Sequence, residues 1–358
     1  MKKYCFTLAI AITALTMVSG LNAQVKKPTE LPNISLIGSI LGTSTAQKKT
    51  FSVSEIELTF QHYLYPSVKA DVFLALHKNA KGERVLELEE GYVTFLDLVE
   101  VLFPGTDYNL GLGAIAGKKL LSVGKVNPLH PEQWAFVDRP LAVQKFLGGE
   151  EGLSAEGAQL SYLLPLPIFS QVEVGYWSAN AAHEEHGAAA SHGVEYENRI
   201  LNGRLWNSVS LSDSQEVELG FNYLLGNASS KEQDDQSQVM GADMSFSQEL
   251  GNNQSLKLQT EFYEATYGED GESREKQTGG FVSAFYKLSK DYQAGVRYGV
   301  LGKHGDDGEE TNQWSVMATR QLTETSKFKL QYNFGEDVDK TVYAKFIFGM
   351  GPHAHVLQ

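Results

Sequence analysis

The chain has 358 residues, of which 42% are hydrophobic and 21% are charged, and its formal net charge is −14. This acidic balance argues against nucleic acid as a partner, because a phosphate backbone binds basic surfaces. The single cysteine, Cys5, lies close to the N-terminus, so the rest of the chain can hold neither a disulfide framework nor a metal site or nucleophile built on cysteine.

The N-terminal segment is typical of a secretory signal peptide. Lys2 and Lys3 form a short basic region, an uncharged and largely apolar stretch follows over 4–18, and small residues lead to Ala23. Cleavage before Gln24 is therefore predicted, and the apolar stretch is too short to cross a membrane as a helix, which leaves an uncleaved N-terminal anchor as the alternative. The predicted division is a signal peptide over 1–23, a periplasmic N-terminal segment over 24–32, a barrel over 33–349 and a C-terminal tail over 350–358.

Alternation of apolar and polar residues is the strongest pattern in the chain. Over 327–334 every even position is apolar and every odd position is polar, and the same kind of alternation recurs over 55–60, 216–221, 255–262 and 293–298. Side chains that alternate with a period of two lie on opposite faces of a strand, whereas an amphipathic helix needs apolar residues three and four apart. These segments are therefore predicted to be strands with one apolar and one polar face.

About sixteen segments of this kind are predicted. Most are about 10–15 residues long, which exceeds the usual strand of a globular sheet and is enough for a tilted crossing of a membrane. The predicted strands are 33–42, 51–64, 67–78, 84–97, 108–122, 153–164, 167–179, 197–212, 214–226, 238–250, 253–267, 277–290, 291–303, 311–322, 325–335 and 339–349.

The connections between these segments alternate in length. Long polar loops follow most odd-numbered segments, and tight turns such as those at 65–66 and 212–213 follow most even-numbered ones. Outer-membrane barrels have short turns at the periplasmic rim and long loops at the outer rim. Two connections depart from this rule, because the periplasmic link over 97–108 is long and the last outer loop, 335–339, is short. The predicted fold is all-β, a transmembrane antiparallel β-barrel of about 16 strands, with a soluble β-sandwich or β-helix as the alternative.

In such a barrel the polar neighbours of the lipid-facing residues line the interior. Mixed charge is typical of a water-filled lumen, and sixteen strands enclose an aqueous channel, although any single charge can equally be part of a solvated wall. The charged residues predicted to face the lumen are Glu55, Glu57, Lys69, Asp71, Arg204, Glu216, Glu218, Lys257, Glu261, Arg297, Lys327, Lys329 and Lys345. The aromatic residues predicted to form girdles at the membrane interfaces are Tyr63, Tyr65, Tyr92, Tyr162, Tyr176, Trp177, Trp206 and Tyr298.

The connection over 123–152 joins the fifth and sixth predicted strands. Three prolines, together with Trp134 and Phe136, predict an ordered loop. It resembles in length the same connection of general porins, which folds inward and narrows the pore. The resemblance implies a porin-like barrel with an inward-folded loop between strands 5 and 6. The residues predicted to form the pore constriction are His130, Glu132, Asp138, Arg139 and Lys145.

Four short motifs carry a further resemblance. They are Asn-Pro-Leu-His-Pro at 127–131, Phe-Val-Asp-Arg-Pro at 136–140, Phe-Leu-Gly-Gly-Glu at 146–150 and Leu-Ser-Tyr-Leu-Leu-Pro at 160–165. The sequence resembles a family of bacterial outer-membrane proteins whose members are often labelled zinc-regulated outer-membrane receptors. The resemblance implies a barrel in the outer membrane of a Gram-negative cell and a link to zinc supply. Gating by TonB is not predicted, because the first predicted strand begins about ten residues after the signal peptide and leaves no room for a plug domain.

A cluster of histidines and glutamates lies in the outer loop over 180–196. Neutral imidazole is a good zinc ligand, and carboxylates can complete a four-coordinate site. The spacing differs from the helical His-Glu-x-x-His motif of metalloproteases, so transient zinc capture is predicted rather than a catalytic zinc, with incidental histidines in an acidic loop as the alternative. The predicted metal ligands are His183, Glu184, Glu185, His186 and His192.

The function predicted from the sequence is an outer-membrane porin-like channel for small solutes that assists the uptake of zinc or other divalent metal ions. The alternatives are a structural or adhesive barrel without transport and an outer-membrane hydrolase. No Gly-x-Ser-x-Gly elbow is present, and His130 near Asp138 lacks an evident serine partner, so no catalytic residues and no enzyme activity are predicted. No cofactor is expected beyond transient zinc. The expected partners are outer-membrane lipid, small solutes or metal ions and, by analogy with sixteen-stranded porins, two further copies in a homotrimer.

Overall fold

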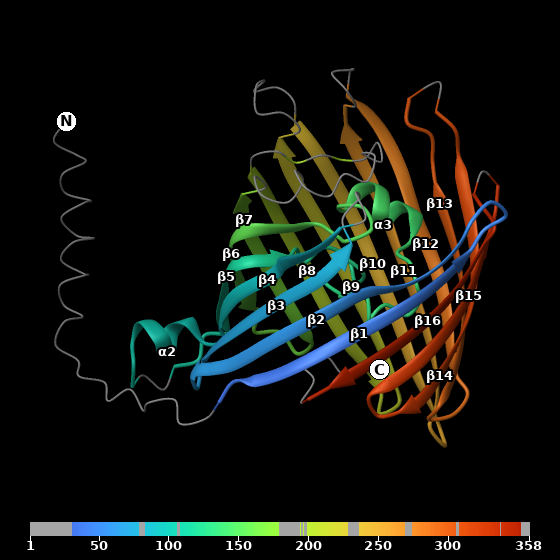
Figure 1. Cartoon of the computed structure of the whole chain (residues 1–358). Coiled ribbons are helices and arrows are strands. Elements are labelled where there is room, and N and C mark those ends of the chain that lie inside the picture. Colours follow the sequence, from blue (N-terminus) through green and yellow to red (C-terminus); the bar gives the residue numbers. More distant parts are fainter. Residues whose placement is uncertain are drawn as a thin grey trace.

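The protein folds as a closed antiparallel β-barrel (Figure 1). The computed structural model describes residues 31–78, 83–105, 108–178, 194, 196, 199–227, 236–268, 274–305, 308–336 and 338–351. Within these ranges the strands are β1 (Asn33–Ser44), β2 (Lys49–Tyr65), β3 (Val68–Lys78), β4 (Arg84–Phe95), β5 (Leu112–Leu120), β6 (Ser154–Leu163), β7 (Phe169–Ser178), β8 (Arg199–Ser212), β9 (Gln215–Asn227), β10 (Gln236–Gly251), β11 (Gln254–Tyr267), β12 (Glu275–Lys287), β13 (Tyr292–Leu301), β14 (Thr311–Thr323), β15 (Ser326–Phe334) and β16 (Thr341–Met350). The predicted sixteen-stranded barrel is therefore confirmed.

Each strand pairs with its neighbours along the chain, and the first strand pairs with the last. In that closing pair Leu36 lies opposite Met350 and Ser44 lies opposite Val342. Closure satisfies the backbone N–H and C=O groups of both strands, so the sheet has no open edge. This is what a sheet in lipid requires, because lipid offers no hydrogen-bond partners.

The two faces of the barrel wall are inverted relative to a soluble protein. On β15 the Lys329 side chain is 2% exposed, whereas the adjacent Leu330 is 47% exposed. Further along the same strand Gln331 is buried and Tyr332 is exposed. Polar side chains inside and apolar side chains outside are the arrangement of a barrel in a membrane, and barrels of this kind belong to outer membranes. The protein is therefore an outer-membrane β-barrel.

Placing a charge on the outer face of β15 is expected to destabilise the barrel. Leu330 is the middle residue of this strand, and we expect Leu330→Arg to lower the free energy of unfolding by about 2–4 kcal/mol, because the guanidinium would face lipid. Thr319→Arg is the matched control, because Thr319 on the adjacent β14 faces a cavity inside the barrel. Equilibrium unfolding in lipid vesicles measures both variants. An equal loss in the two would contradict the assigned faces.

Two short helices lie in the connections of the described chain. α2 (Leu98–Leu102) follows β4, and the Asp97 carboxylate caps it by accepting hydrogen bonds from the N–H groups of Val99 and Glu100. The long periplasmic link noted in the sequence thus contains a capped helix. α3 (Leu141–Phe146) lies in the connection between β5 and β6 and contacts β11, β12 and β13 (Figure 1). Among the residues that the structure describes, no helix is both long and apolar enough to cross a membrane.

Candidate pore constriction

Residues 121–153, which connect β5 to β6, are called the inner loop. Its two ends meet, because the N–H of Leu121 donates to the carbonyl of Leu153 at 2.9 Å. The Asn127 amide donates to the carbonyls of both end residues, and its Oδ1 accepts from Arg139 at 2.7 Å. The buried Arg139 guanidinium also donates to two carbonyls farther along the loop. The inner loop is therefore folded on itself around Asn127 and Arg139, which agrees with the predicted ordered loop.

One side of the inner loop is bound to the wall formed by β8–β11. The Glu261 carboxylate accepts hydrogen bonds from the backbone N–H groups of residues 125–126, at 2.8 and 3.0 Å, and from the Tyr263 hydroxyl at 2.6 Å. Arg204 donates to the Gly124 carbonyl at 2.6 Å. Both Glu261 and Arg204 are buried. Hydrogen bonds to charged groups contribute about 1.5–3 kcal/mol each, so this contact is a firm anchor.

The opposite wall holds His130 of the inner loop. Its Nδ1 lies 3.0 Å from Glu57 of β2 and 3.5 Å from Glu89 of β4, and its Nε2 lies 2.9 Å from Glu90. The Phe73 ring stacks on the imidazole at a centroid separation of 4.8 Å. Burial by itself opposes the charged imidazole, but hydrogen bonds to the three carboxylates hold the pKa of His130 well above its ordinary value. The imidazolium therefore fixes the loop to this wall.

An irregularity in β4 explains how two consecutive glutamates reach one histidine. Phe73 of β3 pairs with Glu90, but the next residue, Leu74, pairs with Leu88. Glu89 is thus an extra residue in β4, a β-bulge. In a regular strand Glu89 and Glu90 would point to opposite faces of the sheet. The bulge re-aims one of them, so that both carboxylates lie close to the histidine.

The middle of the inner loop is bound to β13–β15. The Asp138 carboxylate accepts hydrogen bonds from Arg297 at 2.6 Å, Gln331 at 2.6 Å and Asn333 at 2.5 Å. These three donors come from lumen-facing positions of β13 and β15 and are buried. With the anchors at β2, β4 and β8–β11, this contact shows that the inner loop crosses the interior of the barrel. The predicted inward-folded position is therefore what the structure has.

Apolar side chains fill the space between α3 and the wall. Val143 and Phe146 of α3 are buried against Tyr263 and Trp177, and the Phe146 and Tyr263 rings lie 6.5 Å apart at 68°. This part of the interior is a packed core rather than a polar lining. The prediction for Trp177 is wrong: its side chain is 0% exposed, and its indole N–H donates to Asn202 at 2.6 Å. The reason is that this end of β7 faces the apolar helix inside the barrel and not the membrane interface.

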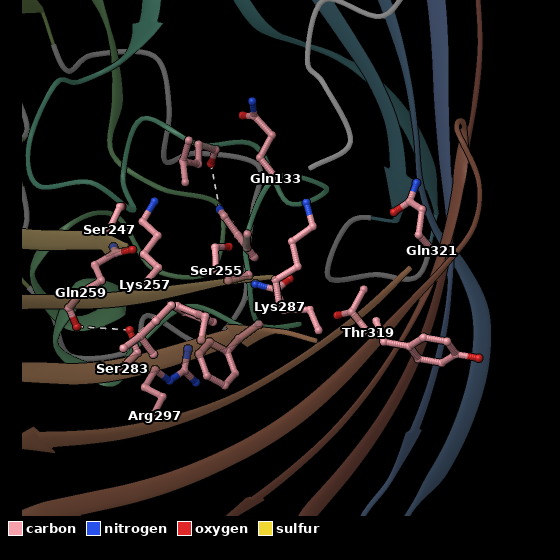
Figure 2. A pocket seen from close by; sticks show the side chains of 18 of the residues that line it. Gln133, Ser247, Ser255, Lys257, Gln259, Ser283, Lys287, Arg297, Thr319 and Gln321 are labelled. Carbon is pink, nitrogen blue, oxygen red and sulfur yellow. Dashed lines mark hydrogen bonds between the residues drawn. The ribbon is translucent and has the colours of Figure 1, made fainter. Parts of the chain in front are cut away.

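A cavity of about 880 Å³, lined by both polar and apolar side chains, lies beside the inner loop. Its lining includes residues of the short turns at 289–291 and 324, which places it on the short-turn side of the loop. Figure 2 shows Lys257 and Lys287 pointing toward the side on which Gln133 of the loop lies. Four basic and four acidic residues line the cavity, so their charges balance. They are Lys257, Lys287, Lys290, Arg297, Asp138, Glu249, Asp291 and Glu324.

Burial shifts the pKa values of other charged groups in the inner loop. It raises the pKa of Glu132 to about 7, and the negative charge of Glu57 acts in the same direction. It lowers the pKa of Lys125 to about 8 and that of Arg139 to about 10. In each case burial penalises the charged form. The inner loop thus places ionisable groups in a partly dehydrated region of the barrel.

The five residues predicted to form the constriction all lie in the inner loop, but they do not form one ring. His130 and Glu132 are buried near β2. Asp138 lies at the opposite wall and lines the cavity, whereas Arg139 points into the loop itself. The Lys145 ammonium lies over the Tyr267 ring, 5.8 Å from its centroid. The residues are therefore spread over the loop, and only some border open space.

Sequence reasoning missed several wall residues that hold the loop, above all Glu89, Glu90, Asn222 and Asp243. The only local signal is in the run Leu-Glu-Leu-Glu-Glu at 86–90, where the alternation breaks at its last residue. Such a break is what a β-bulge produces. Asn222 and Asp243, which bond to each other at 2.8 Å and to Arg204 at 2.7 and 3.1 Å, carry no such signal.

The predicted zinc ligands of the outer loop lie outside the described residues. Their placement therefore stays a prediction, as does the signal peptide over 1–23. The residues concerned are His183, Glu184, Glu185, His186 and His192.

Comparison with known proteins supports the fold. No protein-family model matches the sequence. An uncharacterized protein of Aquifex aeolicus is 23% identical over 349 residues, which cover 86% of this chain and 70% of the relative. OprB of Pseudomonas putida has a TM-score of 0.59 at 13% identity, with 94% of this chain and 97% of the other covered.

Two further solved structures have the same architecture. An anion-selective porin from Comamonas acidovorans has a TM-score of 0.57 at 11% identity, with 89% and 100% of the two chains covered. The trimer form of OmpT, an outer membrane protein of Vibrio cholerae, has a TM-score of 0.56 at 9% identity, with 90% and 100% covered. At these identities the similarity establishes the fold alone. The chain has the fold of outer-membrane porins, and none of these comparisons bears on the resemblance to zinc-regulated receptors.

Proposed function

We propose that the protein is a diffusion channel for small hydrophilic solutes across the outer membrane, narrowed by the inner loop. The observation that carries this proposal is a loop that crosses a sixteen-stranded barrel and borders a cavity of about 880 Å³ with charged residues in its lining. Barrels of this strand number enclose an aqueous channel unless something fills it. The polar and charged residues of this lining suit a hydrated solute, because they replace part of the solute's hydration shell.

A barrel without transport is the second candidate, and a specific observation favours it. The inner loop is bound to walls on several sides, and α3 packs into an apolar core, so a large part of the interior is filled. The two candidates differ in whether a continuous passage remains beside the loop. No catalytic activity is part of either proposal.

Swelling of proteoliposomes distinguishes these two functions. Purified, folded protein in vesicles should admit small neutral sugars and exclude larger oligosaccharides, because the inner loop sets the width of the passage. Heat-modifiable mobility on a denaturing gel verifies that the barrel is folded. Folded protein that admits no sugar of any size would support the barrel without transport and reject the channel.

The proposal extends to divalent metal ions and to assembly. Zinc and related cations are proposed to be among the solutes, because carboxylates and a histidine gather where the loop meets β2 and β4. A homotrimer is proposed as the assembled form, since the structure of Vibrio cholerae OmpT includes a trimer form. Measuring how zinc changes the conductance tests whether metal ions are among the solutes. The mass of the unheated complex in detergent tests whether the assembled form is a trimer.

Reversing the charge at two lysine positions of the cavity is expected to change the ion selectivity of the channel. Lys257 and Lys287 project into the cavity, whose eight charged lining residues balance. Lys257→Glu with Lys287→Glu replaces two positive charges by two negative ones, so cations should be concentrated there and anions repelled. The reversal potential in a potassium chloride gradient should therefore shift toward that of potassium. Lys48→Glu is the control, because Lys48 is an exposed residue just before β2. An identical shift in this control and in the double variant would contradict the assignment of the lining.

A further inference from the structure

Three carboxylates from two parts of the chain converge inside the barrel. Glu55 and Glu57 are two residues apart on β2 and share its lumenal face, and Glu132 is brought to them by the inner loop. One oxygen from each lies within 4.8 Å of the other two. Glu57 is 1% exposed and Glu132 is 3% exposed, whereas Glu55 is half-buried. Like charges so close and so shielded from water repel one another strongly.

Glu132 supplies a second observation, independent of the clustering. Its Oε1 is buried and has no hydrogen-bond partner among the residues that the structure describes. A buried polar oxygen without a partner costs about 1–3 kcal/mol, and more when it is charged. The carboxylate cluster also borders a small cavity of about 10 Å³, which is lined by Glu55 and Glu132 together with Ser39 and Pro131. That volume is close to what one water molecule or one ion occupies.

The surroundings of the cluster are those of a built ligand set. Glu57 also belongs to a second group, with Glu89 and His130, whose ligand atoms lie within 4.8 Å of one another. The other ring nitrogen of His130 lies 2.9 Å from Glu90, and that carboxylate accepts a hydrogen bond from the Leu120 N–H at 2.6 Å. His130 in turn donates to Glu57 at 3.0 Å, and hydrogen bonds of this kind orient the carboxylates that bind metal ions.

We infer that this cluster binds one divalent cation through Glu55, Glu57 and Glu132. Carboxylate oxygens are the ligands that hard divalent cations such as Mn²⁺ prefer, and Zn²⁺ also accepts them. The cation would neutralise the buried carboxylates and give Glu132 Oε1 a partner. It would also fasten the inner loop to β2, because Glu132 belongs to the loop and the two other ligands belong to the strand. The competing explanation is that lysines of the wall balance the cluster without a cation. They are Lys345 of β16, whose ammonium lies 3.5 Å from the Pro131 carbonyl, and Lys327 and Lys329 of β15, whose positive charges act on Glu132.

Calorimetric titration of the full barrel in detergent with Mn²⁺, and separately with Zn²⁺, tests this inference. The protein titrated is the triple variant His183→Ala, His186→Ala and His192→Ala, which is called the background protein. In this variant the histidines of the outer loop cannot bind the added ions. After treatment with a chelator, at least one of the two ions should bind at about one equivalent per chain. Because removal of a ligand oxygen weakens a metal site, Glu132→Gln should lower the affinity by at least about tenfold. Glu249→Gln, in the cavity on the other side of the loop, is the matched control and should bind as the background does.

Thermal unfolding separates a metal site from a purely structural role of Glu132. At one and the same ion concentration, the ion should raise the melting temperature of the background protein more than that of Glu132→Gln, because the variant binds it at least about tenfold more weakly. Without metal, Glu132→Gln should be at least as stable as the background, because it removes a buried like charge. If this variant fails to fold, Glu55→Gln carries the same test.

The inference is overturned if neither ion binds to the folded background, or if both glutamine variants bind the ion with unchanged affinity. These measurements do not involve conductance, so the cation site and the proposed channel can each fail alone.

Discussion

Excising the inner loop is expected to convert a narrow passage into a wide one. Residues 124–151 would be replaced by a Gly-Ser linker of about four residues, a length typical of hairpin loops. The linker can close the gap because the ends of the loop already meet, with the Leu121 N–H bonded to the Leu153 carbonyl at 2.9 Å. Removal takes away the segment that is bound to β2, β4, β8–β11 and β13–β15. Single-channel conductance should rise several-fold, and the largest sugar that enters vesicles should increase in size.

The physical reason is that a sixteen-stranded barrel is wide enough for an aqueous channel when nothing crosses it. Excision also exposes apolar residues such as Trp177 and Tyr263 to water, so the variant should be less stable than the wild type. Circular dichroism and heat-modifiable mobility establish whether the barrel has formed. Conductance and sugar size limit that stay at the wild-type values in a folded, excised barrel would show that the inner loop does not set the passage.

Replacing Phe146 by alanine is expected to release the inner loop while leaving the barrel closed. Phe146 is the last residue of α3, and its side chain is fully buried against the barrel wall. There it contacts the Tyr263 ring and belongs to the apolar cluster that includes Trp177. Truncation of a buried phenylalanine costs about 3–5 kcal/mol, because contacts are lost and a cavity remains. The strands themselves keep their hydrogen bonds, so the loss falls on the attachment of the loop.

Native-state proteolysis measures this attachment. A cost of about 3 kcal/mol or more raises the fraction of molecules with a detached loop by roughly 100-fold, since 1.4 kcal/mol corresponds to tenfold. Cleavage within residues 121–153 should accelerate accordingly, and the barrel should remain intact on a gel. Glu150→Ala is the control, because Glu150 lies in the same loop but is exposed. Equal cleavage rates in Phe146→Ala and the control would mean that the cluster does not hold the loop.

The strands could be predicted from the sequence because each face of the wall meets one solvent. Lipid outside and polar groups inside impose a strict period of two, and the alternation over 325–335 predicts the strand that the structure places at Ser326–Phe334. Where a strand meets a turn the prediction is less accurate. The predicted strand over 108–122 is observed over Leu112–Leu120, because Gly111 adopts a left-handed conformation with φ of 69° and the inner loop begins at Leu121.

The contacts of the inner loop could not be predicted, because they join residues far apart in the chain. The Lys125 N–H bonds to Glu261, which is 136 residues away, and the Val137 N–H bonds to Gln331, which is 194 residues away. No local pattern encodes such pairs. The order of the loop was predictable from its prolines and aromatic residues, whereas its anchors were not.

Two other features escaped prediction because they break the rule that the interior is polar. At the C-terminal end of β7 the Trp177 side chain points into the barrel, because the apolar face of α3 packs there. The bulge at Glu89 turns an extra carboxylate toward His130, and a single inserted residue changes which face every following side chain occupies. Both features depend on contacts with the inner loop. A prediction that considers only which face of each strand meets lipid and which meets water could not include them.

Single-channel recording of the wild-type protein in planar lipid bilayers tests the central claim most directly. The proposed channel should insert in discrete conductance steps that are smaller than those of the barrel without its inner loop, because the loop leaves only part of the lumen open. A folded, membrane-inserted wild-type barrel that passes no ions, in a preparation whose excised variant conducts, would contradict the proposed function and identify the inner loop as a permanent plug.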